Sequence, residues 1–217
     1  FGYRLYASHT LRLIDSAAGL AVTNPPEGQK MIDLDGVMVP DEGLRTPWGK
    51  QTSLISLPYL LTGLELGFDA QSAEIAWRIM QIQQRRHGLR APKPPVSTDY
   101  AEPAPDYVND LPDRQPVQAR NLRDEVPEKV AMTSTRTAFA WYALFRNSWS
   151  EALRQQVLPL QVPGKGWQRG LNLNNSVNAV VDADTNAIVL ESLSYIAHGQ
   201  MLCLACLYTS PSAGATP

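Results

Sequence analysis

Cysteine and histidine are scarce in this chain of 217 residues, which holds two of the first and three of the second. Two cysteines cannot build a disulfide framework or a four-cysteine zinc site. The histidines, His9, His87 and His198, lie far apart in the sequence and offer no HExxH motif. The sequence therefore gives no reason to expect a metal or another cofactor.

The sequence also lacks a large excess of positive or negative charge, and it lacks long apolar runs. Nineteen basic side chains stand against twenty-one acidic ones, for a formal net charge of -2. This balance gives no electrostatic reason to expect nucleic acid or an anionic membrane as a partner. The most apolar stretch, residues 187–208, is interrupted by Glu191, His198 and Gln200, so no transmembrane helix is predicted. With 44% hydrophobic residues, the chain is nevertheless expected to fold around a core.

Motifs for nucleotide binding and nucleophilic catalysis are missing as well. The chain contains no GxGxxG, no phosphate-binding P-loop and no GxSxG. Cys203 and Cys206 have the CxxC spacing of redox sites, but they follow a predicted helix within an apolar stretch. A redox pair is expected to open a helix after a strand, so free thiols are the favoured interpretation.

Helical spacing of apolar residues predicts a mainly α-helical protein. The first helix is expected over residues 3–14, and because it starts without Met or a signal peptide, the chain is expected to be a piece of a longer protein. Further helices are expected at residues 56–67, 69–87, from 134, 148–160 and 184–198, with Asp69, Ser148 and Asp184 as N-caps. The inner faces are expected to hold Tyr3, Tyr6, Ala7, Thr10, Leu11 and Ile14 in the first helix, Ile75, Ile79 and Ile82 in the third, and Ala187, Leu190 and Leu193 or Ser194 in the last.

Three segments lack a helical period. Residues 31–40 alternate apolar and acidic side chains and predict a short strand or an extended loop. Residues 92–127 hold eight prolines and predict a long extended surface segment. Residues 163–175 are rich in glycine and asparagine and predict a turn region that contains Trp167.

Carboxylates near aromatic residues are the remaining chemical resource. Asp33 and Asp35 share one side of an extended stretch, where they are either turn-formers and helix caps or a functional pair. Glu65 and Glu191 interrupt apolar stretches, where they are either solvated or salt-bridged or else carboxyl groups of raised pKa suited to general-acid work. Trp48 and Trp167 fall in predicted loops and are the tryptophans best placed to stack on a sugar ring.

Four stretches, read together, resemble the domain-of-unknown-function 3131 family of extracytoplasmic bacterial proteins. The two specific ones are residues 56–67 (SLPYLLTGLELG) and the pair 166–170 (GWQRG) and 184–191 (DTNAIVLE). Residues 2–7 (GYRLYA) and 137–141 (TAFAW) add weaker support. Their order resembles the C-terminal half of that family over residues 1–202, leaving residues 203–217 as a tail.

The resemblance implies a fold and a class of activity. The family is similar to the six-hairpin glycosidases, whose (α/α)6 toroid carries a carbohydrate cleft at one end. The N-terminal half of the toroid would then come from a missing part of the same domain or from another chain. Arg4 and Leu57 stand where acidic residues are expected, which implies lost activity if those acids are catalytic in the family.

Two hypotheses of different class follow. The first is a periplasmic or secreted protein that binds or hydrolyses a bacterial polysaccharide, with Asp33, Asp35 and Glu65 as its catalytic candidates. In this hypothesis Tyr59, Trp48, Trp167, Asp184 and Asn186 would bind the substrate. The second is a non-catalytic scaffold in an envelope or exopolysaccharide-secretion complex, with the proline-rich segment lying along a partner.

Overall fold

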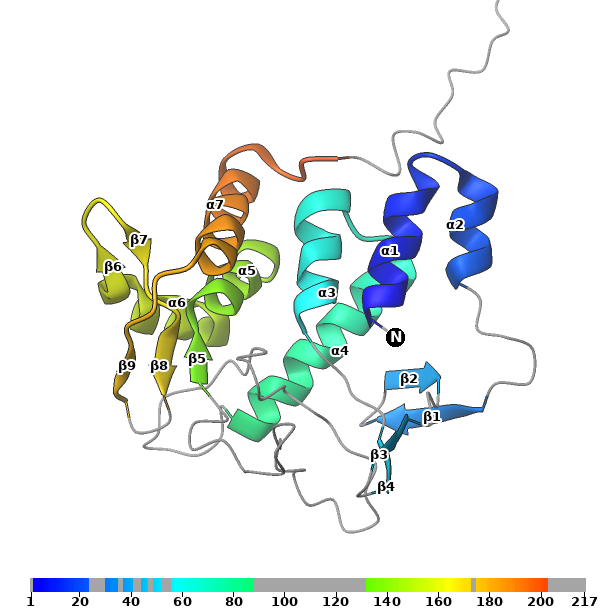
Figure 1. Cartoon of the computed structure of the whole chain (residues 1–217), viewed down its shortest axis with the longest axis horizontal. Coiled ribbons are helices and arrows are strands. Elements are labelled where there is room, and N and C mark those ends of the chain that lie inside the picture. The colour runs from blue at the N-terminus through cyan, green and yellow to red at the C-terminus, as the bar shows by residue number, and fades with distance from the viewer. Residues whose placement is uncertain are drawn as a thin grey trace, which may run out of the picture.

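The computed structural model describes residues 2–23, 30–34, 37–40, 44–46, 49–51, 56–87, 132–172 and 175–202. Helices dominate these residues, as the sequence predicts (Figure 1). In chain order the elements are α1 (Gly2–Arg12), α2 (Ser16–Thr23), β1 (Met31–Leu34), β2 (Val37–Pro40), β3 (Leu44–Thr46), β4 (Gly49–Gln51), α3 (Leu57–Leu61), the π-helix η1 (Thr62–Leu66), α4 (Ala70–His87), β5 (Met132–Ser134), α5 (Thr135–Leu144), α6 (Ser148–Val157), the 3₁₀-helix η2 (Leu158–Leu160), β6 (Gln161–Val162), β7 (Gly166–Trp167), β8 (Gly170–Asn172), β9 (Val177–Asn178) and α7 (Ala183–His198).

The helices form two groups that meet at α3 and η1. Helix α1 packs against α2, and α5 packs against both α6 and α7. Between these groups, η1 contacts α1, α5 and α7, while α4 runs diagonally behind them (Figure 1). The π-helix therefore lies where three helices from distant parts of the sequence converge.

The core is centred on α5 and α3. Four consecutive residues of α5, Ala138 to Trp141, are buried, and Trp141 is fully enclosed. Its indole Nε1 donates a hydrogen bond to the buried Gln83 Oε1 on α4 at 3.1 Å, so no polar atom of that ring is left unpaired. This burial confirms the broad apolar surface that the sequence predicts for α5.

The predicted starts and stops of the central helices are largely confirmed. Pro58 lies in the first turn of α3, where its missing N–H costs no hydrogen bond, and Gly67 ends η1 with φ +77°. Asp69 Oδ1 accepts a hydrogen bond from the Ser72 N–H and caps α4. Ile75 and Ile79 are buried, as predicted, whereas the side chain of Ile82 lies outside the described residues.

Two predicted N-caps are wrong by one or two residues. Asn147, rather than Ser148, caps α6, because its Oδ1 accepts from the Ser150 N–H in a reciprocal capping box. Asp182, rather than Asp184, caps α7 by accepting from the Thr185 N–H. In each case several capping residue types occur close together, and the sequence alone does not rank them.

The predicted inner faces of α1 and α7 are also wrong. Helix α1 buries Ser8 and His9, because Ser8 Oγ donates to the Gly19 carbonyl and His9 pairs with Asp69. Helix α7 buries Ser192, whose hydroxyl donates to the Ile188 carbonyl within the helix. The residues of the predicted stripes that are exposed instead are Tyr3, Ala7, Thr10 and Leu11 in α1, Ile14 just after it, and Ala187, Leu190 and Leu193 in α7.

Short strands replace part of the predicted turns. The alternation in residues 31–40 forms the antiparallel β1–β2 hairpin, which confirms an extended segment there. Residues 163–175, predicted as turns, contain β7 and β8, and β8 lies between β5 and β9 in a three-stranded sheet. Strands of two or three residues are too short to show a period of two in the sequence. The proline-rich segment 92–127 and the CxxC pair lie outside the described residues.

Candidate acid–base site

Glu65 lies in the π-helix η1, between Leu64 and Leu66. Both leucines are buried in the core, whereas Glu65 itself is partly exposed. A π-helix is a rare departure from α-helical geometry, and such segments are frequent at functional sites. The local backbone thus singles out the one carboxylate that interrupts this apolar stretch.

Tyr6 joins α1 to this carboxylate. Its phenolic Oη donates a hydrogen bond to Glu65 Oε2 at 2.6 Å, across 59 positions of sequence. A bond this short between a hydroxyl and a carboxylate is of the charge-assisted kind. Burial raises the pKa of the Tyr6 phenol well above its usual range, and the hydrogen bond to Glu65 and the charges of Glu65 and Glu191 add to that increase.

Glu191 on α7 is the second carboxyl group of the site. Its Oε2 atom is buried and has no hydrogen-bond partner within the described part of the chain. Burial raises the pKa of Glu191, and the nearby negative charge of Glu65 raises it further. Glu191 therefore keeps a proton to higher pH than an ordinary glutamate does.

The two carboxyl groups have unlike surroundings. Glu65 accepts a hydrogen bond from a phenol, whereas the buried oxygen of Glu191 accepts none among the described residues. Two neighbouring acids in different environments are a common arrangement for general acid–base chemistry, because one can hold a proton while the other accepts one.

A second polar cluster fixes α1 against α4, one turn beyond Tyr6. His9 is buried, and its Nε2 lies 3.0 Å from Asp69 Oδ2, with Arg12 Nη1 at 3.6 Å from the same oxygen. The hydrogen bond to His9 holds the pKa of Asp69 well below its usual range. Because Asp69 also caps α4, the cluster ties the helix that carries Tyr6 to the turn that follows η1.

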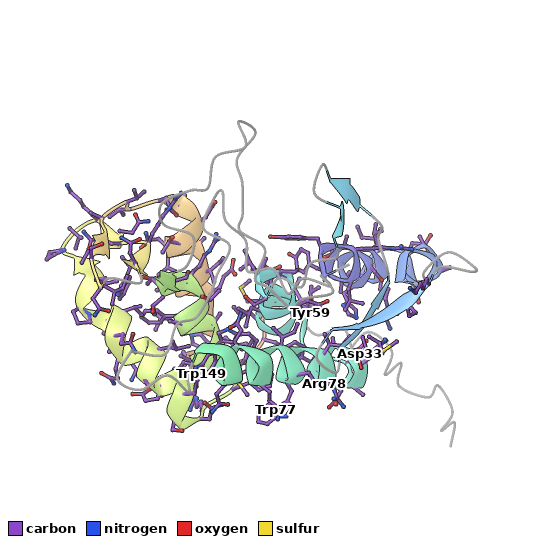
Figure 2. All side chains as sticks on the ribbon, turned by 90° about the horizontal axis from the view of Figure 1, so that it is seen from below. Asp33, Tyr59, Trp77, Arg78 and Trp149 are labelled. Atoms are coloured by element: carbon purple, nitrogen blue, oxygen red, sulfur yellow. The ribbon has the colours of Figure 1, made fainter. Side chains whose placement is uncertain are left out.

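Of the two predicted catalytic residues that the structure describes, Glu65 lies in this site and Asp33 does not. Asp33 is exposed on the β1–β2 hairpin, which lies toward the start of α3, whereas η1 continues from its end (Figure 1). In Figure 2, Asp33 is seen near one end of α4. Asp35 falls outside the described residues, as does the predicted sugar-stacking residue Trp48.

Two predicted substrate-binding aromatics belong to the core instead. Tyr59 is only 1% exposed, in the middle of the molecule, so its side chain lies in the core rather than on an open surface (Figure 2). Trp167 packs edge-to-face on Phe139 with ring centroids 5.4 Å apart, and its Nε1 is buried. This ring is part of the margin of the core rather than a free stacking platform.

The two polar residues predicted to bind substrate lie at the start of α7. Asp184 is exposed in the first turn of the helix. Asn186 is engaged structurally, because its Oδ1 accepts from the Trp167 N–H at 2.7 Å and its Nδ2 donates to the Trp167 carbonyl. These bonds attach β7 to α7, so Asn186 has a positioning role in the fold.

Sequence reasoning missed two members of the site. Tyr6 fell in a stripe that was assigned to the core, and no local pattern links it to a glutamate 59 positions away. Glu191 did carry a signal, since it is an acid within an apolar helix, but the sequence offered nothing that paired it with Glu65.

Comparisons with known proteins give one match. Residues 1–199 match the family described as "Protein of unknown function (DUF3131)". No curated protein and no solved structure matches the chain. None of the helices in the described part has the length and apolar character that a bilayer crossing requires. Within the same residues, histidine, cysteine, aspartate and glutamate nowhere gather in threes that could hold a metal ion. Because the match spans nearly the whole sequence, the chain belongs to the DUF3131 family.

Proposed function

We propose that this chain is an extracytoplasmic carbohydrate-active protein that acts on a bacterial polysaccharide, with Glu191 and Glu65 as the acid–base pair of a glycoside hydrolase. The observation that carries the proposal is the buried Oε2 atom of Glu191, which has no hydrogen-bond partner among the described residues. Burial and the charge of Glu65 both raise the pKa of this carboxyl group. Glycoside hydrolysis generally requires two carboxyl groups, one of which holds a proton at the working pH.

Each residue of the site has a defined role in this proposal. Glu191 donates its proton to the glycosidic oxygen as the bond to the anomeric carbon breaks. Glu65 acts on the anomeric carbon, either directly as the nucleophile or as the base that removes a proton from the attacking water. Tyr6 orients Glu65 through its 2.6 Å hydrogen bond. Retention or inversion at the anomeric carbon, followed by NMR, distinguishes the two roles of Glu65.

The arrangement of helices is compatible with a toroid of the six-hairpin glycosidase type. Helices α1 and α2, like α5 and α6, are neighbours in sequence that pack together across a three-residue connection. Such hairpins are the repeating unit of an (α/α) toroid. Fold likeness alone is weak support for chemistry, so the proposal depends on the acid pair.

The test is hydrolysis of candidate bacterial glucans and exopolysaccharides by the whole chain and three variants. Glu191→Gln and Glu65→Gln are each expected to lower turnover by about 10²–10⁴-fold, because each removes an acid or base from the transition state. Glu151→Gln is the matched control, since Glu151 is ion-paired to Arg154 on α6 and lies outside the site. Equal activity in all three variants would contradict the proposal.

A scaffold role is the second candidate, and exposed apolar side chains favour it. Leu190 is 63% exposed and Leu193 is 39% exposed on α7, and Val180 and Val181 just before the helix are also exposed. Exposed apolar side chains of this size favour contact with a partner protein. If no glycan is bound or cleaved and Leu190→Glu abolishes a complex that forms with the wild-type chain, the scaffold is the better account.

A further inference from the structure

We infer that residues 199–202 form a positioning strap that holds Glu65 beside Glu191. The inference rests on the proposed function for its effect on turnover, but its geometry is independent of any substrate. The chain leaves α7 at His198, turns at Gly199 and then runs over η1, where two of its N–H groups bond to the π-helix. In Figure 1 this segment passes above the end of the helix formed by α3 and η1.

Two backbone N–H groups of the strap donate hydrogen bonds to carbonyl oxygens of η1, one of them the carbonyl of Glu65. The Leu202 N–H donates to the Glu65 carbonyl at 2.7 Å, and the Met201 N–H donates to the Leu64 carbonyl at 3.4 Å. The last carbonyls of any helix lack partners within that helix. Here the partners come from the segment that follows α7, so the backbone of Glu65 is fastened to the chain that carries Glu191.

Two glycines allow the strap to make this path. Gly199 has φ +82° and closes α7 through its N–H bond to the Tyr195 carbonyl, a backbone conformation that disfavours residues with a Cβ. Gly67 has φ +77° at the end of η1, and the end of the Gln200 side chain lies beside it. The strap thus lies directly against the turn that ends the π-helix.

The consequence for the site follows from how the two acids are connected. Helix α7 contacts η1 directly, and the strap adds a second link between them through Met201 and Leu202, ten and eleven positions beyond Glu191. The charge of Glu65 on η1 raises the pKa of Glu191 on α7. Tyr6 on α1 is the other titratable group here, and its hydroxyl donates a hydrogen bond to Glu65. If the strap is released, η1 can move relative to α7 and the two carboxyl groups separate.

The experiment removes one hydrogen-bond donor from the strap and measures the pKa of Glu191. Leu202→Pro deletes the N–H that bonds to Glu65, and Leu202→Ala keeps it while removing the same side chain. An amide-to-ester replacement at position 202 deletes the N–H without a proline ring, and serves if Leu202→Pro does not fold. The readouts are titration of the Glu191 carboxyl by ¹³C NMR, assigned with Glu191→Gln, and turnover of a cleaved glycan.

Loss of the donor is expected to lower the pKa of Glu191 toward the usual glutamate range and to reduce turnover on the order of 10²-fold. Leu202→Ala is expected to match the wild type in both readouts, and Met201→Pro to have a smaller effect because its bond is longer. A strap with only a structural role would lower the melting temperature and leave the Glu191 titration unchanged, which would overturn the inference. Shifted titration in a protein that cleaves no glycan would support the strap and contradict the proposed function.

Discussion

Replacing Tyr6 by Phe tests the link between α1 and the site. The change removes one hydroxyl, and with it the 2.6 Å hydrogen bond to Glu65 Oε2. A hydrogen bond to a charged group contributes about 1.5–3 kcal/mol, and partial exposure of both partners places this bond near the lower value. For a protein of this size, about 1.5 kcal/mol lowers the melting temperature by roughly 3–6 °C.

The pH dependence of this loss has a definite sign. The pKa of the Tyr6 phenol is raised in the folded state, mainly by burial and then by Glu65. Its contribution to stability is therefore complete below about pH 10, where the unfolded phenol is protonated, and is lost as pH rises toward the folded pKa. The difference between the wild type and Tyr6→Phe should thus be constant from pH 7 to 9 and shrink above about pH 10.

The assay is urea unfolding across this pH range, with Tyr142→Phe as the control. Tyr142 lies on α5, and its ring, which Phe retains, faces the Arg154 guanidinium at 4.4 Å. The control is expected to stay within about 0.5 kcal/mol of the wild type. The double variant with Glu65→Gln should lose less than the sum of the single losses, because both changes break the same bond. Equal stability of the Tyr6 and Tyr142 variants would refute the reasoning.

Three further changes test the fold that positions the site. Asp69→Asn keeps the cap of α4 but removes the charge facing His9, so a loss of about 0.5–1 kcal/mol is expected at neutral pH. Because the folded pKa of Asp69 lies well below the unfolded value of about 4, this loss should be complete above about pH 4 and shrink progressively as the pH falls below it. A loss that stays the same from about pH 7 down to about pH 2 in urea unfolding would exclude an ionic contribution. Asn147→Ala should lower the free energy of unfolding by about 1 kcal/mol, because it removes the cap of α6, whereas Ser148→Ala should be nearly neutral. A larger loss for Ser148→Ala than for Asn147→Ala in thermal unfolding would instead support Ser148 as the cap. Leu153→Ala, at a fully buried position, should lower the free energy of unfolding by about 2–5 kcal/mol, whereas Leu190→Ala on the exposed face of α7 should change it little. Similar losses in the two variants would show that the exposed face of α7 is assigned wrongly.

Much of the helical framework could be predicted from the sequence, because its signals are local. Pro58, Gly67 and Asp69 are turn and cap residues whose conformational preferences set where helices begin and end. The inner faces of α1 and α7 could not be predicted in this way. Ser8 and Ser192 are buried because their hydroxyls donate hydrogen bonds to backbone carbonyls. The spacing of apolar residues carries no information about such hydrogen bonds.

The site could be predicted only in part, because it is assembled from three distant segments. An acid within an apolar stretch is the signal that predicts Glu65, and the same signal marks Glu191. Their proximity depends on how η1 packs against α7, and the part of Tyr6 depends on a contact across 59 positions. Asp33, by contrast, is predicted from its spacing to Asp35, and the structure places Asp33 opposite Met38 in the β1–β2 hairpin.

The central claim is that partial burial and the neighbouring charge of Glu65 together raise the pKa of Glu191. Titration of the Glu191 carboxyl by ¹³C NMR, in the wild type and in Glu65→Gln, tests this most directly and needs no substrate. The account predicts that Glu191 titrates above the usual glutamate range in the wild type, and that its pKa falls in Glu65→Gln because the neighbouring charge is gone while the burial remains. An ordinary glutamate titration in the wild type, or a raised one that Glu65→Gln does not move, would contradict it.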